Sequence, residues 1–218
     1  MIKNTDKLFI TRKRKKWKFA HFADWQNCFE VSEVNPKQWS SPLVIEVGAG
    51  TADLSVGLAK LQPQNNFVAI DVKADRLYTG AKFCLQNDIK NINFARSHAA
   101  QIEELFRPHT VDKVWITFPD PFPRDRQAKH RLTNRSFLKI YQKLLAPGGV
   151  VHFKTDNREL FLWSLEQIVA DGWRINELSF DLHESNLPEH YKITTFYERK
   201  FMAQGVPINM VSFTKSDM

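Results

Sequence analysis

From residue 43 onward, short apolar runs alternate with segments whose apolar residues recur at helical spacing. Parallel strands need long crossover connections, so this alternation favours an α/β fold with a mostly parallel sheet and helices on both faces. The expected strands are LVIEV, FVAID, INFAR, VDKVWITF and VVHFKTD, at residues 43–47, 67–71, 92–96, 111–118 and 150–156. The expected helices lie near residues 53–61, 74–87, 100–106, 134–145 and 159–170.

The last part of the chain has a different pattern. The segments WRINELSFD (173–181) and TTFYERKF (194–201) are typical of strands, and no helical period lies between them. We expect them to form an antiparallel pair that closes a seven-stranded sheet. Residues 1–40 show neither pattern, and we expect an irregular, partly flexible basic arm there, followed by one domain over residues 41–218.

The composition excludes several classes of protein. A chain of 218 residues is long enough for one α/β domain. No apolar run approaches the roughly 20 residues of a membrane span. No apolar segment typical of a secretory signal follows the basic start, so we expect a cytoplasmic protein. Cys28 and Cys84 are the only cysteines, and no cysteine or histidine pair has metal-ligand spacing, so we expect neither a disulfide nor a metal site.

The net charge of +7 is concentrated in two segments. Residues 11–18, TRKRKKWK, carry +6, and residues 124–131, RDRQAKHR, carry +3. Two separate basic clusters favour contact with a polyanion at defined places. Taken alone, residues 11–18 are equally compatible with a solvated basic arm.

A glycine turn follows the first expected strand, in VIEVGAGTADLS. Gly48 and Gly50 allow a sharp turn that brings a ligand against the backbone. A dinucleotide fingerprint places a third glycine where this chain has Asp53, and a carboxylate there opposes a pyrophosphate. The pattern therefore disfavours NAD.

Two acids flank this turn. Asp71 ends the second expected strand about 20 residues further on, where a carboxylate accepts hydrogen bonds from the ribose hydroxyls of an adenosine cofactor. Glu46 comes just before the turn. A cationic cofactor without phosphates, S-adenosylmethionine (SAM), suits such a site. In the alternative interpretation, Glu46 caps backbone amides and Asp71 is a solvated strand end.

The fourth expected strand ends in FPDPFP, with Asp120 between Pro119 and Pro121. Prolines fix their own φ and restrict the residue before them, so the carboxylate is held in a rigid extended segment at the carboxyl edge of the sheet. Phe122 beside it can stack on a flat ring, and together they indicate a site for a polar ring. The alternative is an ordinary Asp-Pro turn that leaves a strand.

The chain resembles the bacterial tRNA (guanine-N7-)-methyltransferase family in four segments: IEVGAG, FPDPFPRDRQAKHRL, APGGVVHFKTDN and TFYERKF. The resemblance spans about residues 43–205 and implies a single-domain, Rossmann-like class I SAM-dependent methyltransferase fold. It also implies transfer of a methyl group from SAM to N7 of a guanosine in the variable loop of tRNA. Whether the protein is a monomer or a homodimer stays open.

The resemblance assigns roles to residues at matching positions, and Asp120 is the expected catalytic residue. The expected cofactor contacts, including the two glycines of the turn, are Glu46, Gly48, Gly50, Asp71, His98 and Asp120. The expected tRNA contacts are Arg124, Arg126, Lys129, His130, Arg131, Asp156, Thr195, Phe196, Tyr197 and Glu198. The chain departs from the family's usual pattern with His98 in place of an acid, Ala52 in place of a glycine and Phe122 in place of a tryptophan.

Guanine N7 carries a free lone pair at neutral pH, so its attack on the methyl group needs no general base. We therefore expect Asp120 to accept hydrogen bonds from the N–H groups of the guanine and to offset the positive charge that moves onto the base. Two other functions are compatible with the sheet and the charge pattern. A nucleotide-dependent oxidoreductase would use the same sheet and Asp71, and a non-catalytic RNA-binding protein would use the same basic segments. Neither class explains Asp120.

Overall fold

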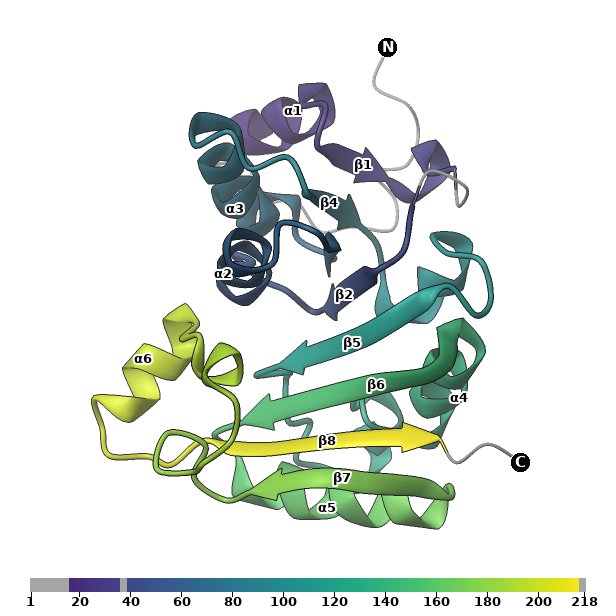
Figure 1. Cartoon of the computed structure of the whole chain (residues 1–218), viewed down its shortest axis with the longest axis vertical. Helices are drawn as coiled ribbons and strands as arrows, with labels where there is room; N and C mark the ends of the chain where they lie inside the picture. The colour runs from purple at the N-terminus through teal and green to yellow at the C-terminus, as the bar shows by residue number, and fades with distance from the viewer. Residues whose placement is uncertain (1–15, 36–38, 216–218) are drawn as a thin grey trace.

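The computed structural model describes residues 16–35 and 39–215, which form one sheet with helices on both faces (Figure 1). The strand order is β1-β4-β3-β2-β5-β6-β8-β7. The strands are β1 Cys28–Glu30, β2 Leu43–Val47, β3 Asn66–Asp71, β4 Ile92–Arg96, β5 Val111–Thr117, β6 Leu145–Thr155, β7 Trp173–Ser179 and β8 Asn209–Lys215. The helices are α1 Lys16–Asp24, α2 Asp53–Leu61, α3 Ala74–Gln86, α4 Arg135–Leu144, α5 Arg158–Ala170 and α6 Phe196–Met202, with 3-10 helices η3 Val31–Glu33, η5 Ala99–Glu104, η6 Asp125–His130 and η7 Glu189–Lys192.

The expected α/β, Rossmann-like architecture is confirmed. Strands β1 to β6 pair in parallel, and β8 runs antiparallel to both β6 and β7. From β2, the chain adds β3 and β4 on one side of the sheet and later adds β5 and β6 on the other. Open sheets of this kind bind ligands at such a switch point, outside the carboxyl ends of the strands. The ends of β2 and β5 are therefore the place to look for a site.

Helices cover both faces because alternate strand residues point to opposite sides of the sheet. Ile45 of β2 packs in the cluster that α4 and α5 complete with Leu138 and Phe161. Its neighbour Val44 packs on the other side, in the cluster that includes Leu77 of α3. The periods that located these helices in the sequence therefore correspond to real buried faces.

The expected strand at residues 194–201 is wrong. Most of that segment lies in α6, whose N-cap is Thr195, and the antiparallel partner of β7 is β8, further along the chain. The reason is a capping box: the Thr195 hydroxyl accepts from the Glu198 amide at 3.2 Å, and a Glu198 carboxylate oxygen accepts from the Thr195 amide at 3.1 Å. This reciprocal pair satisfies two amides at the start of a helix. The Thr-x-x-Glu spacing in the sequence could have indicated the start of a helix here.

The expectation of an irregular arm is wrong for residues 16–33, which contain α1, β1 and η3. The expected count of seven strands is also wrong, because the sheet has eight strands within the described ranges. Trp25, after α1, stacks on Tyr78 of α3 with 4.7 Å between ring centroids. The Asn27 side-chain amide donates to the Ala81 carbonyl at 3.3 Å. Long-range packing therefore stabilises these elements, and β1 is too short to show a period. The first part of the basic segment, residues 11–15, lies outside the described residues.

None of the helices in the described ranges is both long and apolar enough to span a lipid bilayer.

A buried histidine on β6 makes stability depend on pH. His152 stacks on Trp115 with 4.3 Å between ring centroids, and neither ring nitrogen has a hydrogen-bond partner within the described residues. Burial, with smaller contributions from Lys113 and His190, lowers the pKa of His152 from 6.5 to about 3. The unfolded chain therefore binds a proton below pH 6.5 that the folded chain does not accept until near pH 3.

Between pH 7 and pH 5, His152 is expected to reduce the free energy of unfolding by about 2 kcal/mol, because one pKa unit corresponds to about 1.4 kcal/mol. His152→Phe keeps the ring but removes the titrating group, so its stability should fall less over this range. Urea unfolding at both pH values measures the difference, with the exposed His21→Phe as control. Equal losses in the parent protein and in His152→Phe would contradict the assignment.

Candidate active site

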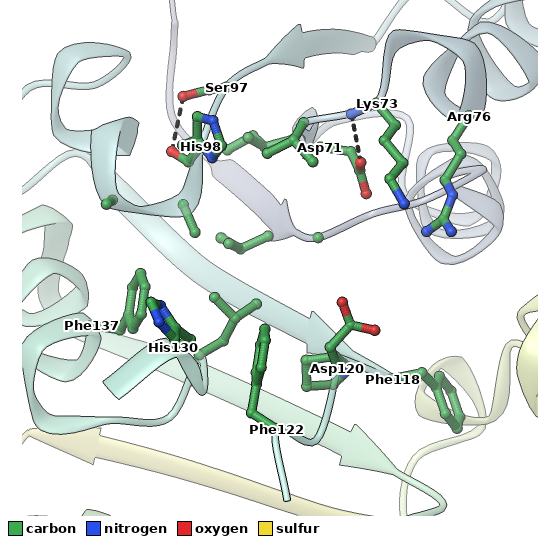
Figure 2. Close-up of a pocket in the computed structure, with 18 residues that line it drawn as sticks. Asp71, Lys73, Arg76, Ser97, His98, Phe118, Asp120, Phe122, His130 and Phe137 are labelled. Atoms are coloured by element: carbon green, nitrogen blue, oxygen red, sulfur yellow. Dashed lines mark hydrogen bonds between the residues drawn. The ribbon is translucent and has the colours of Figure 1, made fainter. Parts of the chain in front are cut away.

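Two adjoining cavities lie at the carboxyl ends of the central strands. The larger, about 400 Å³, lies between the start of α3 and the segment after β5, and Figure 2 shows its lining side chains. The smaller, about 270 Å³, lies between the glycine turn and the start of α6. Gly48, Arg76 and Phe118 line both cavities, so the two are neighbours.

The glycine turn is fastened to Asp71. One Asp71 carboxylate oxygen accepts from the Gly50 amide at 2.9 Å, and the other accepts from the Lys73 amide at 2.8 Å. Gly48 and Gly50 have φ values of +78° and +58°, which glycine adopts without a steric penalty. Ala52 has φ +61° without being glycine, so its departure from the family pattern is accommodated with some strain. Asp71 thus lines the larger cavity in a fixed orientation.

Glu46 lies below the turn, buried, and lines neither cavity. Its carboxylate accepts hydrogen bonds from the Ser55 hydroxyl at 2.5 Å, the Ser55 amide at 3.2 Å and the Thr117 hydroxyl at 2.6 Å. Burial raises the pKa of Glu46, while these hydrogen bonds and Lys154 act in the opposite direction. Its contacts match the alternative interpretation, in which it caps backbone amides at the start of α2.

Asp120 points into the larger cavity, from the side opposite to Asp71, Lys73 and Arg76 (Figure 2). Within the described part of the chain, its carboxylate accepts no hydrogen bond, so its oxygens are available to a ligand. The two aromatic residues beside the flanking prolines, Phe118 and Phe122, have φ values of +47° and +44°. Bulky residues rarely adopt this left-handed backbone, so the surrounding structure must impose it.

The five expected RNA contacts after Asp120 lie in different places. Arg124, Arg126 and Lys129 are exposed at the surface. His130 lines the larger cavity, 5.6 Å from the Phe122 ring between centroids. Arg131 is 9 % exposed, and its guanidinium donates to backbone carbonyls inside the protein.

His98 and Asp156 follow the ends of β4 and β6. His98 lines the larger cavity next to Ser97, at the position before η5. Asp156 is half-buried and lines neither of the two cavities, and burial raises the pKa of its carboxyl group.

The first three residues of the Thr-Phe-Tyr-Glu segment line the smaller cavity, and the fourth lies in the interior. Thr195, Phe196 and Tyr197 line the smaller cavity, and the last two are exposed. Glu198 is fully buried, and its carboxylate lies 2.7 Å from the Lys154 ammonium and 2.9 Å from the His183 ring. Glu198 therefore supports this segment from below and does not line either cavity.

Two residues that the sequence interpretation missed hold α6 in place. Lys154 of β6 is fully buried and donates to the carbonyls of Tyr191 and Ile193 at 3.1 and 2.8 Å, as well as to Glu198. Burial lowers the pKa of Lys154, and Glu198 opposes this shift. Asp53 accepts from the Phe196 amide at 2.7 Å. A lysine within an apolar strand was a signal, because lysine is rarely buried without a partner. The sequence marked Asp53 only as a departure from the dinucleotide fingerprint, and nothing in it indicated the contact with Phe196.

In the described residues, no group of three or more His, Cys, Asp or Glu side chains could hold a metal ion.

The chain is similar to known methyltransferases along most of its length. A family model described as "Putative methyltransferase" matches residues 40–211. A tRNA (guanine-N(7)-)-methyltransferase of Cytophaga hutchinsonii is 38 % identical over 92 % of this chain and 97 % of its own length. The enzyme of that name from Lachnoclostridium phytofermentans is 37 % identical over 82 % of this chain and 83 % of its own length.

Solved structures of other methyltransferases share the fold. The 16S rRNA methyltransferase KamB superposes with a TM-score of 0.62 at 15 % identity, over 84 % of this chain and 91 % of its own. The 16S rRNA (adenine(1408)-N(1))-methyltransferase from Catenulisporales acidiphilia gives 0.61 at 14 % identity, over 84 % and 94 %. At such low identity, the likeness concerns the fold alone.

Proposed function

The chain belongs to the tRNA (guanine-N(7)-)-methyltransferase family, and from this we infer that it transfers a methyl group from SAM to N7 of a guanosine in tRNA. We further propose that the guanosine lies in the variable loop and that the protein acts in the cytoplasm, where unmodified tRNA is available. The observation that carries the proposal is the position of Asp120, whose available carboxylate faces Asp71 across one cavity.

The larger cavity has the size and the chemistry to hold SAM. Its volume of about 400 Å³ lies within the usual range for small-molecule sites. Each Asp71 oxygen accepts one backbone N–H and keeps a second lone pair, which suits it to the ribose hydroxyls of an adenosine. When bound, SAM would supply the methyl group on a positively charged sulfur.

The protein's own contribution is positioning and electrostatics. Guanine N7 needs no base to remove a proton, so Asp120 acts by accepting hydrogen bonds from the N–H groups of the guanine and by offsetting the positive charge that develops on it. Phe122 and His130 line the same cavity and offer flat surfaces to an unstacked base. Holding both reactants in line can lower the barrier by roughly 7 to 11 kcal/mol.

The exposed cations next to Asp120 are proposed to contact phosphates of the tRNA. Replacing Arg124, Arg126 and Lys129 together with alanine should make the slope of log affinity against log salt shallower by about 2 to 3, because each phosphate contact contributes about 0.7 to 0.9. The rate at saturating tRNA should change little. Filter binding across a salt series measures the slope.

Exposed cations on other elements provide the control for this experiment. Lys139 on α4 and Arg174 on β7 are exposed, and replacing both with alanine should leave the salt slope close to that of the parent protein. Equal slopes for the triple variant and this control would show that the segment after Asp120 does not contact phosphates.

The direct test of the proposed function is incubation of the protein with tritiated SAM and unmodified tRNA, followed by mapping of the labelled base. We expect label on a guanosine of the variable loop, as 7-methylguanosine. Label on a uridine, or on C5 of a cytosine, would assign another methyltransferase activity. A tRNA shift in a gel without label would indicate a non-catalytic RNA-binding protein, and retained nicotinamide absorbance would indicate an oxidoreductase.

A further inference from the structure

The segment that carries Asp120 has few backbone hydrogen bonds of its own. Pro119, Pro121 and Pro123 have no N–H group, and the Phe118 amide donates to the Lys154 carbonyl at 2.9 Å at its start. Phe118 and Phe122 also have the left-handed backbone described above. Such a backbone persists only where contacts from elsewhere hold it.

At Pro121 and Phe122, those contacts come from Arg131. Its Nε atom lies 3.1 Å from the Pro121 carbonyl oxygen and 3.3 Å from that of Phe122, and its Nη2 atom donates to Phe122 at 3.0 Å. The guanidinium carbon lies 4.4 Å from the centroid of the Trp163 ring. Arg131 therefore connects the Asp120 segment to α5, which belongs to the packed layer behind the sheet.

We propose that Arg131 is a positioning residue that holds Asp120 in its catalytic orientation, and that it is not a tRNA contact. This inference rests on the proposed methyl transfer. The guanidinium donates to two neighbouring carbonyls within an almost fully buried site, so it has little surface left for a phosphate. A planar fork of donors suits two acceptors at once, which a lysine ammonium does not reproduce.

Arg131→Lys keeps the charge and removes the fork. We expect kcat to fall by about 100-fold, because a displacement of about 1 Å at the reacting groups has that effect. The KM for tRNA and the salt slope should stay near the parent values. Arg174→Lys makes the same exchange at an exposed arginine of β7, outside both cavities, and as the control it should keep kcat. If Arg131 instead contacts phosphate, Arg131→Lys will keep kcat, and Arg131→Met will raise the KM and make the salt slope shallower by about 1.

Two further measurements separate positioning from general damage to the fold. In an Asp120→Asn background, Arg131→Lys should lower kcat by less than about threefold, because residues that act through one another are not additive. In Arg131→Ala, millimolar guanidinium should restore at least about tenfold in kcat by filling the vacated space beside Trp163. Independent, multiplicative losses in the double variant, together with no rescue, would overturn the proposal.

The role of Arg131 can also be measured without substrate, from the mobility of the segment that carries Asp120. Hydrogen–deuterium exchange of peptides that cover residues 117–127 should accelerate in Arg131→Lys and remain unchanged in Arg174→Lys. If the parent protein transfers no methyl group to tRNA, the proposed function fails, while the exchange still decides whether Arg131 fastens this segment. Unchanged exchange in Arg131→Lys would show that it does not.

Discussion

Replacing Asp120 with asparagine is expected to lower kcat by about 10²- to 10³-fold while SAM still binds, because a fixed charge aimed at the reacting groups has an effect of this size. Asparagine has the same shape and keeps one oxygen acceptor, so the cavity should not collapse. It lacks the negative charge that offsets the charge developing on the guanine. Single-turnover transfer of labelled methyl groups, with calorimetric binding of S-adenosylhomocysteine, measures the two effects separately.

Asp125→Asn is the control for this experiment, since Asp125 is an exposed acid of the same segment and lines neither cavity. It should retain the parent rate. A parent-like rate in Asp120→Asn would show that the carboxylate has no part in catalysis. A loss of S-adenosylhomocysteine binding that matches the loss of rate would assign Asp120 to cofactor binding alone.

Replacing Lys154 with methionine is expected to reduce the free energy of unfolding by about 3 to 5 kcal/mol, the usual effect of removing one partner of a buried ion pair. Lys154 and Glu198 are both fully buried, 2.7 Å apart. Methionine leaves the Glu198 carboxylate with His183 and the Thr195 amide as its partners among the described residues, and it leaves the Tyr191 and Ile193 carbonyls without this donor. Urea unfolding at neutral pH measures the loss.

The surface pair of Lys90 and Asp88 is the control, because its atoms lie 3.0 Å apart and both side chains are 81 % exposed. Lys90→Met should change stability by less than about 1 kcal/mol. Adding Glu198→Gln to Lys154→Met should recover part of the loss, because it removes the buried charge that was left behind. A loss in Lys154→Met no larger than that in Lys90→Met would show that the buried pair does not stabilise the fold.

This buried pair also bears on the smaller cavity. Lys154 fixes the carbonyls of Tyr191 and Ile193, and Glu198 caps α6, so together they place Thr195, Phe196 and Tyr197 at the cavity wall. A carboxylate in a motif can thus shape the wall of a cavity without lining that cavity.

Most of the fold follows from the sequence because the central strands are buried along their length and the helices bury one face. The central strands were located as short apolar runs, and α2, α3, α4 and α5 by apolar residues at helical spacing. The two errors have different causes. Strand β1 is three residues long and is held by α3 and β4. At residues 194–201 the apolar pattern suited a strand, and the capping box of Thr195 and Glu198 decided for a helix.

The sequence by itself determined which residues end the strands, and therefore that Gly48, Gly50, Asp71 and Asp120 lie near one another at one edge of a parallel sheet. Only the tertiary structure decided which polar side chains face the cavities and which face inward. Arg131 and Glu198 belong to polar motifs, yet their partners lie inside the protein. The physical reason is that a polar side chain satisfies its hydrogen bonds with whichever donors and acceptors the packed fold brings to it. The partner can lie in the same motif, as Phe122 does for Arg131, or on another element, as Lys154 does for Glu198, and residue types at a given spacing do not distinguish the two.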